Sequence, residues 1–486
     1  MKAIFQVLAL SLALILLFTQ CNKDPEADDP VYFSDDAFLI TLIEQGIDAN
    51  GDSLIQMSEA REITYLDISR KRISDISGIE AFVNLEFLDC GYNQISTLDV
   101  SKNTALSGLG CRNNRISDLN LSANTALSSL FCNENQLDTL DLSKNTALTS
   151  LYCAGNQLTT LDLSKNTGLE QLDCRLNKFT TLDLSKNILL RELVCSGNKL
   201  NALDLTANMY LELVSCYGNH LSALELTNNT ALEALWCSDN QITLLDLSDN
   251  TRLEDLDCGD NLLTTLDLSK NTLLISLSCN DNELTALDLS KNTHLEQLYC
   301  GWNQISSLDI SNNTALEQLI CANNQLSSLD VSNKPNLFSL GCWNNLINSL
   351  DISGNTALEE LFCLNNQIAN LDVSNNLSLV NLNCERNRLT TLDVTALTEL
   401  NVLQCSLNSL SLLDVSENLE LNILDCSGTQ LTSLNISNNI QLEDLGIRGM
   451  TTLSEVCVWA MPFPPQGLVV DLTDSPNAYF TTECSL

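Results

Sequence analysis

Residues 148–163 read Leu-Thr-Ser-Leu-Tyr-Cys-Ala-Gly-Asn-Gln-Leu-Thr-Thr-Leu-Asp-Leu, and their pattern returns every 21 residues from about residue 85 to about residue 447. The repeated template is LxxLxCxxNxLxxLDLSxNTx. Cysteine marks it most clearly, because 17 cysteines from Cys90 to Cys426 follow one another at this single spacing. A fixed period of this length predicts a solenoid, in which each unit buries its apolar side only by stacking on its neighbours.

Each unit contains two similar halves, LxxLxCxxNx and LxxLDLSxNTx. In both halves an apolar-x-apolar core precedes asparagine, which is the signature of a leucine-rich repeat. Alternation in an extended chain turns the two apolar residues inward and the middle residue outward. We therefore expect a flattened coil with short parallel strands on both of its sides.

The template resembles the nested 21-residue bacterial repeats of the IRREKO type, over roughly three quarters of the chain, and residues 63–98 resemble the 22-residue repeats of internalins. The resemblance implies an α/β-type solenoid dominated by short parallel β-strands, a right-handed coil with a cap at each end. The expected organisation is a lipoprotein signal peptide (1–20), a disordered tether (21–33), a helical EF-hand-like cap (34–62), the leucine-rich-repeat solenoid (63–447) and a C-terminal cap (448–486).

The N-terminus has the features of a targeting segment. Lys2 precedes an apolar run, residues 7–18, that is too short to span a membrane as a helix. The run leads to Cys21 and resembles a bacterial lipoprotein signal. The acidic segment that follows, residues 22–29, resembles the export tag of surface lipoproteins in the Bacteroidetes group. The resemblance implies lipidation of Cys21, an anchor in the outer membrane and exposure at the cell surface. An ordinary secretory signal with a chance cysteine is the alternative.

Residues 34–45 have the pattern of a helix that Ser34 can cap. Residues 48–59, which follow, are similar to a twelve-residue EF-hand calcium loop, except that Ser53 replaces the glycine of the sharp turn. The similarity implies a structural Ca²⁺ that stiffens the cap, with a polar turn that binds nothing as the alternative. The ligands implied are Asp48, Asn50, Asp52, Leu54, Gln56 and Glu59.

The template stops near Arg448, and the remaining residues predict a cap over the open end of the solenoid. Cys457 and Cys484 lie off the cysteine ladder, and in an oxidising exterior they are expected to form a disulfide. Two free thiols are the alternative. The ladder cysteines are expected to be buried and unreactive, because Ile68 and Ile447 occupy the same column.

Composition and motifs exclude several classes of function. The formal net charge of −39 argues against nucleic acid, whose binding depends on Lys and Arg at phosphates. The two histidines lie in unlike contexts, and no phosphate loop, zinc motif or nucleophile elbow occurs. An enzyme is therefore not expected.

Function is expected in the variable columns beside the ladder cysteines. In leucine-rich repeats the first-strand surface is the concave ligand face, so the resemblance makes this surface the binding site. Exposed aromatic residues suit a protein hot spot or a sugar platform. We expect a cell-surface recognition or adhesion protein that binds a protein partner, with glycan capture as the alternative. The candidate residues are Phe131, Tyr152, Tyr217, Trp236, Tyr299, Trp302, Trp343 and Phe362.

Overall fold

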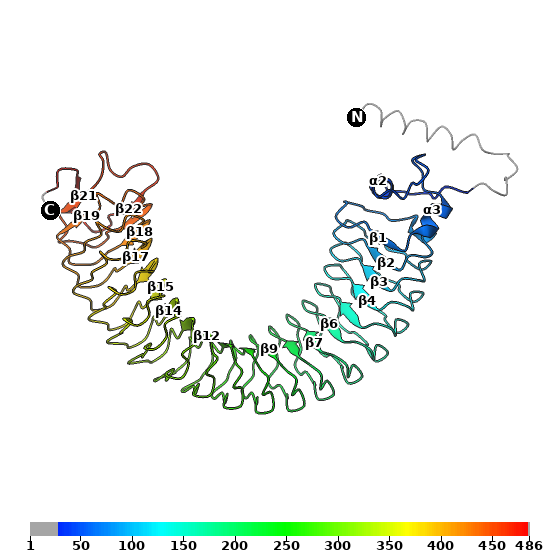
Figure 1. Cartoon of the computed structure of the whole chain (residues 1–486), viewed down its shortest axis with the longest axis horizontal. Coiled ribbons are helices and arrows are strands. Elements are labelled where there is room, and N and C mark those ends of the chain that lie inside the picture. Colours follow the sequence, from blue (N-terminus) through cyan, green and yellow to red (C-terminus); the bar gives the residue numbers. More distant parts are fainter. Residues whose placement is uncertain (1–27, 485–486) are drawn as a thin grey trace. The chain divides into compact units, whose positions relative to one another are not determined.

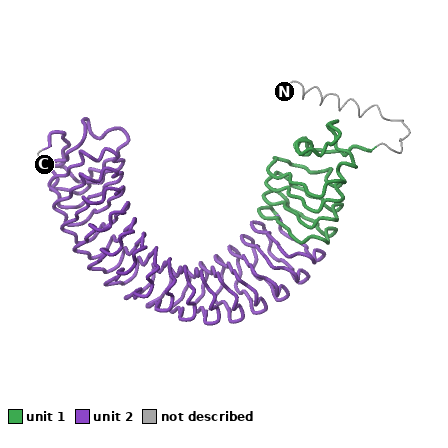
Figure 2. The backbone as a smooth tube through the Cα atoms, in the orientation of Figure 1, with its two compact units in different colours: residues 1–136 green, residues 137–486 purple. Residues whose placement is uncertain are grey.

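The computed structural model describes residues 28–484, so the predicted signal peptide, Cys21 and the first part of the tether lie outside the described residues. The chain divides into two compact units, residues 1–136 and residues 137–486 (Figure 2). The division falls inside the repeats rather than at either cap. Among the described residues, no helix is both long enough and apolar enough to cross a membrane.

The described part of unit 1 holds a helical segment followed by a parallel sheet, β1-β2-β3-β4. The prediction that Ser34 caps the first helix is wrong, because Asp35 Oδ1 accepts a hydrogen bond from Ala37 N (2.8 Å) while Ser34 Oγ donates to Asp75. The described elements of this unit are α2 (Asp36–Glu44), α3 (Met57–Glu62), β1 (Tyr65–Asp67), the 3-10 turn η1 (Ile79–Ala81), β2 (Phe87–Asp89), β3 (Gly108–Gly110) and β4 (Ser129–Phe131).

Unit 2 adds one three-residue strand to a parallel sheet with each turn of the coil. This unit follows an arc, and the strands of the sheet line its inner side (Figure 1). In sheet order the strands are β5 (Ser150–Tyr152), β6 (Gln171–Asp173), β7 (Glu192–Val194), β8 (Leu213–Ser215), β9 (Ala234–Trp236), β10 (Asp255–Asp257), β11 (Ser276–Ser278), β12 (Gln297–Tyr299), β13 (Gln318–Ile320), β14 (Ser339–Gly341), β15 (Glu360–Phe362), β16 (Asn381–Asn383), β17 (Val402–Gln404), β18 (Ile423–Asp425), β20 (Asp444–Gly446) and β22 (Val469–Asp471).

The prediction of a parallel solenoid is confirmed. The prediction of strands on both sides of the coil is wrong for most turns. The second half of the repeat forms strands only near the C-terminal end, as β19 (Ser433–Asn435), β21 (Glu455–Cys457) and β23 (Tyr479–Thr481). In most of the other turns the aspartate of LDLS accepts a hydrogen bond from the backbone two residues later, as Asp141 Oδ1 does from Ser143 N (2.9 Å). This local bond fixes the bend that follows, and it is compatible with a strand, since Asn435 on β19 and Asp425 on β18 accept the same bond.

Two rows of buried asparagine bind successive turns together. In the first row, Asn261 Nδ2 donates to the carbonyls of Cys237, Cys258 and Gly259, and its Oδ1 accepts from Ile242 N. In the second row, each amide donates to carbonyls of the preceding turn, as Asn271 does to Asn250 O (2.9 Å). The rows therefore satisfy backbone groups that the turns leave without a ladder partner.

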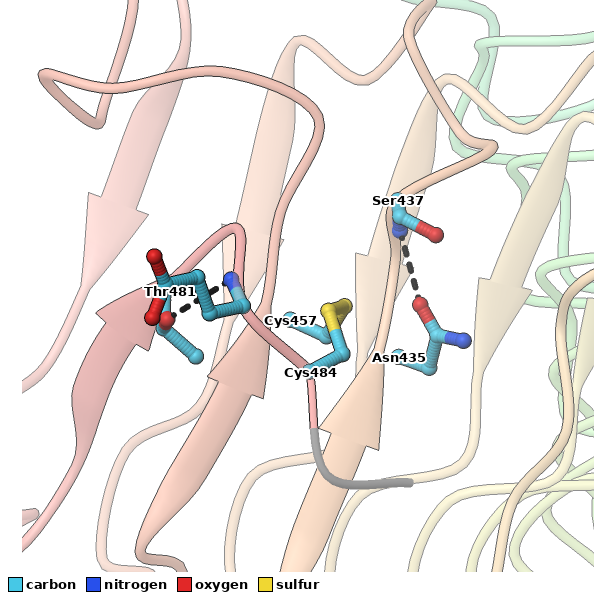
Figure 3. The surroundings of a disulfide bond; sticks show 6 residues. Asn435, Ser437, Cys457, Thr481 and Cys484 are labelled. Carbon is cyan, nitrogen blue, oxygen red and sulfur yellow. Dashed lines mark hydrogen bonds between the residues drawn. A yellow bond between two sulfur atoms is a disulfide. The ribbon is translucent and has the colours of Figure 1, made fainter.

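The coil continues beyond residue 447, where the repeat template ends. β22 extends the large sheet and β23 extends the smaller sheet, because Val470 and Phe480 supply the apolar positions of the lost template. Cys457 on β21 is joined by a disulfide to Cys484, with their Cα atoms 5.5 Å apart (Figure 3). The chain thus covers its end by continuing both sheets and by tying the segment after β23 back to β21.

Candidate ligand-binding face

The candidate face consists of the outward side chains of β5–β18 and the residues just after each ladder cysteine; we call it the first-strand face. On most of these strands the middle residue is buried and the residues at either end are more open, as with Gln297 and Tyr299 around Leu298. The strand β14 is buried at all three positions, and β6, β8 and β16 each end on a buried residue. Two residues after each cysteine the backbone is left-handed, as at Trp302, where φ is 50°. We call these positions the left-handed column.

The structure places most of the candidate aromatic residues on this face of unit 2, whereas Phe131 lies on β4 in unit 1. Tyr217 and Trp302 are the open members, with exposed fractions of 42% and 44%. The others are partly covered and belong to strands or to the residue after a ladder cysteine: Tyr152, Trp236, Tyr299, Trp343 and Phe362.

Trp302, Trp343 and Phe362 form a continuous group of rings, which together with Tyr299 we call the aromatic patch. The ring centroids of Trp302 and Trp343 are 5.9 Å apart and those of Trp343 and Phe362 are 6.4 Å apart, both edge to face. Gly341 on β14 makes this packing possible, since a Cβ atom there would overlap the Trp343 ring. Edge-to-face contacts of this kind add stability beyond area burial.

One asparagine fixes both indoles. With its side-chain oxygen turned toward the rings, Asn323 accepts from Trp302 Nε1 at 3.3 Å and from Trp343 Nε1 at 3.2 Å. Tyr299 is also held, because its hydroxyl donates to Gln318 Oε1 on the next strand. The polar atoms of the patch are thus satisfied within the protein, and the open part of Trp302 is its apolar ring.

The remaining candidates are held separately along the sheet. Trp236 Nε1 donates to Asp255 Oδ2 (2.9 Å) and the Tyr152 hydroxyl donates to Gln171 Oε1 (3.2 Å). Each of these side chains is therefore held by a hydrogen bond to the strand of the following turn. The structure joins Trp302, Trp343 and Phe362, places Tyr299 on β12 of the same group of turns, and leaves Tyr152, Tyr217 and Trp236 outside that patch.

A second aromatic group, which the sequence reasoning missed, lies in unit 1. Tyr65 and Phe87 stack with centroids 5.1 Å apart and planes 6° from parallel, and Tyr65 is 63% exposed. Beside them the Arg70 guanidinium lies 3.9 Å from the centre of the Tyr92 ring. Tyr65 and Phe87 open their strands, whereas the predicted binding columns lie beside the cysteines. Aromatic residues at that first strand position were the signal that could have revealed them.

The EF-hand-like loop is closed by its own hydrogen bonds. Asp48 Oδ1 accepts from Gly51 N (2.8 Å), and Glu59 Oε2 accepts from Gln56 N (2.9 Å). Ser53 has a φ of 68°, so it adopts the left-handed turn that glycine normally provides. The side-chain oxygens of the loop are the hard donors that calcium prefers. Over residues 28–484, however, no group of three or more His, Cys, Asp or Glu side chains is arranged to hold a metal ion.

Searches of protein-family models and of curated proteins by sequence returned no match. Among solved structures, the functional domain of InlJ from Listeria monocytogenes, which includes a cysteine ladder, is 30% identical, with a TM-score of 0.62 and coverage of 84% of each chain. YopM from Yersinia enterocolitica is 22% identical (TM-score 0.66, covering 89% of this chain and 94% of that one). The plant peptide hormone receptor RGFR1, solved in complex with RGF2, is 20% identical (TM-score 0.66, 86% and 79%). The repeat, the asparagine rows and the likeness to InlJ agree, and the chain belongs to the leucine-rich-repeat proteins.

Proposed function

We propose that this protein is a recognition protein, not an enzyme, and that it binds a protein ligand on the first-strand face with the aromatic patch as its anchor. The observation that carries the proposal is the open ring of Trp302, which is 44% exposed and packs edge to face on Trp343. Interface hot spots are rich in tryptophan and lie in packed clusters of this kind. RGFR1, which has the same fold, was solved with its ligand RGF2.

Preorganisation supports the same function. Asn323 and Gly341 hold the two indoles before any ligand arrives, so that few side-chain rotations are lost on binding. The sheet beneath is rigid, because every strand of β12–β15 pairs with a neighbour on both sides. A fixed aromatic surface of this kind favours a specific partner over a nonspecific apolar contact.

Replacing Trp302 and Trp343 together by alanine is expected to weaken ligand binding about a hundredfold or more, because hot-spot truncations cost about 2 kcal/mol or more each. Peptides selected from a displayed library against the purified protein would be the ligands, measured by surface plasmon resonance. Tyr217→Ala is the matched control, since Tyr217 is equally open but lies outside the patch. Equal losses in the double variant and in the control would contradict the proposal.

Glycan capture is the second candidate, favoured by the amides of Asn323, Asn344 and Asn365, which line up beside the tryptophan ring in the left-handed column. Aromatic rings flanked by amides suit sugars, which stack and accept hydrogen bonds. A glycan array run beside the peptide selection separates the two. Reproducible sugar binding that the double tryptophan variant loses, with no selected peptide, would replace protein recognition by glycan capture.

We also propose that the protein is a lipoprotein at the surface of the bacterial outer membrane, anchored through Cys21. The support is the signal-like sequence before Cys21 and the acidic segment after it. Incorporation of labelled palmitate in a bacterial host, compared with Cys21→Ser, tests the anchor. A chain that takes up no label would be secreted or anchored by other means.

A structural Ca²⁺ in the loop of residues 48–59 is proposed as a stabiliser of the N-terminal cap. Millimolar calcium is expected to raise the first thermal unfolding transition by a few degrees, since a ligand that binds only the folded state adds about 2.7 kcal/mol at a hundred times its dissociation constant. Differential scanning calorimetry with calcium and with chelator measures it. Asp48→Ala should abolish the calcium effect, whereas Asp36→Ala on α2 should leave it intact. Identical curves with calcium and with chelator would rule the site out.

A further inference from the structure

Three aspartates precede Trp302 in the left-handed column on consecutive turns. They are Asp239, Asp260 and Asp281, with φ values of 52°, 48° and 50°, next to 50° at Trp302. Their backbone N–H groups donate to the following turn, to Gly259, Asn280 and Gly301 at 3.1, 2.8 and 3.1 Å. The four side chains therefore project in register from the same edge of the first-strand face.

These carboxylates lack neutralising partners. All three are exposed, and over residues 28–484 no cation or hydrogen-bond donor reaches them within bonding distance. Partial burial raises the pKa of Asp260, and the charges of Asp281, Asp239 and Asp257 raise it further. The column thus holds like charges that repel one another, in contrast to Asp141, Asp162 and Asp183 in the second half of the repeat, where each carboxylate accepts a local N–H and its pKa is lowered.

The spacing fits an extended chain lying across the strands. Neighbouring parallel strands are about 4.8 Å apart, so four positions of the column span about 14 Å. An extended peptide rises about 3.3 Å per residue, and four or five of its residues cover this length. Side chains on one side of such a peptide recur about every 6.7 Å, so two of them would share the three aspartates and a third would reach the tryptophan.

We propose that the ligand segment on the first-strand face is an extended basic peptide, with two Lys or Arg side chains shared among Asp239, Asp260 and Asp281 and an apolar or cationic side chain on the Trp302 ring. The inference rests on the proposed recognition function and adds the chemistry of the partner. Cations opposite the column relieve its repulsion, and a cation beside an open indole gains a cation–π contact. An acidic partner would add repulsion along the same edge.

The test uses two triple variants that remove the same charge. Asp239→Asn/Asp260→Asn/Asp281→Asn neutralises the column, where asparagine already occurs at Asn323, Asn344 and Asn365 with positive φ. Asp141→Asn/Asp162→Asn/Asp183→Asn is the matched control in the second half of the repeat. Asparagine already takes that role at Asn120 and Asn435, whose Oδ1 atoms accept the same turn hydrogen bond. Both variants should therefore fold like the parent.

The probe is a fluorescein-labelled nonapeptide of alternating Lys and Val, compared with its Glu–Val and Lys–Ser counterparts by fluorescence anisotropy at physiological salt. The column variant is expected to weaken Lys–Val binding about tenfold, since each exposed ion pair contributes about 0.2–1 kcal/mol. The control triple should change it less than about twofold, because charges beyond the Debye length are screened. The Glu–Val peptide should not bind.

Equal weakening in the two triple variants would mean attraction by net charge alone, and no weakening in the column variant would mean that the aspartates are not used. Either result overturns the basic-peptide inference. Peptides from the displayed library that depend on Trp302 but not on the column would leave the proposed function standing while removing this inference. Loss of all tryptophan dependence would remove the proposed function itself.

Discussion

The folded protein is expected to unfold cooperatively between about pH 9 and pH 10. Cysteine thiols of the unfolded chain lose their protons near pH 8.5, whereas the buried ladder thiols of the folded chain keep theirs at this pH. All 17 ladder cysteines are buried. Burial raises the pKa of Cys216, Cys300 and Cys342 to about 12. For Cys258 and Cys279 burial raises the pKa most, and the neighbouring thiol adds to the rise.

The sign follows from proton binding in the two states. Below about pH 8.5 both states hold the thiol proton, so the ladder gives no pH dependence. Above it the unfolded chain binds fewer protons than the folded chain, and stability falls by about 1.4 kcal/mol per pH unit for each thiol. Half of the ladder would give roughly 11 kcal/mol per pH unit, which is comparable with the whole stability of an ordinary domain.

Urea unfolding monitored by circular dichroism at pH 7.5, 8.5 and 9.5 measures this effect. The window lies below the usual pKa of Tyr and Lys, so that thiols dominate it. A variant with Cys237, Cys258, Cys279 and Cys300 replaced by valine is the control, since Ile68 and Ile447 already fill the same column with apolar side chains. It should lose stability less steeply with pH. A thiol reagent that modifies the native protein quickly at pH 8 would contradict the burial on which the prediction rests.

The first half of each repeat was predictable because its signal is redundant. An apolar residue, leucine in 16 units and Val214 in one, alternates with cysteine at one period over 17 units, and every unit buries both residues. The second half carries the same alternation, Leu-Asp-Leu, yet forms strands only at β19, β21 and β23. The hydrogen bond from Ser143 N to Asp141 does not explain the difference, because Asn435 on β19 accepts the same bond. Strand pairing depends on the distance between successive turns, which periodicity within one turn does not encode, and in unit 2 the paired strands line the inner side of the arc (Figure 1).

The candidate site was predictable as a surface and unpredictable as a patch. Aromatic residues beside the cysteines could be assigned to one face, but the contact between Trp302 and Trp343 joins residues two turns apart. It depends on the missing side chain of Gly341 and on the amide of Asn323, neither of which stands out in the sequence. The left-handed column carried only a weak signal, since glycine occupies it in four turns, whereas Leu176 and Arg386 adopt positive φ there as well.

Asn261→Ala is expected to lower the free energy of unfolding by about 4 kcal/mol, because unsatisfied buried polar groups cost about 1–3 kcal/mol each. The substitution removes donors to three carbonyl groups and the acceptor for the N–H of Ile242. Asn261 is only 6% exposed, so water reaches those groups poorly. The asparagine row thus acts as a second ladder of hydrogen bonds beside the sheet. Loss of one asparagine should destabilise the turn on either side of it.

Urea unfolding gives the size of the loss, and hydrogen exchange gives its place. The amide of Ile242 should lose protection, because nearest-neighbour contacts dominate a solenoid and a defect stays near its turn. Asn261→Thr should cost less, since Thr429 holds the equivalent position in a later turn and its Oγ1 donates to Cys426 O (2.7 Å). Thr264→Ala, an exposed change in the same turn, is the control. If Asn261→Ala were no more destabilising than that control, the asparagine rows would contribute no stability of their own. The sheet and the buried leucines alone would then hold the turns together.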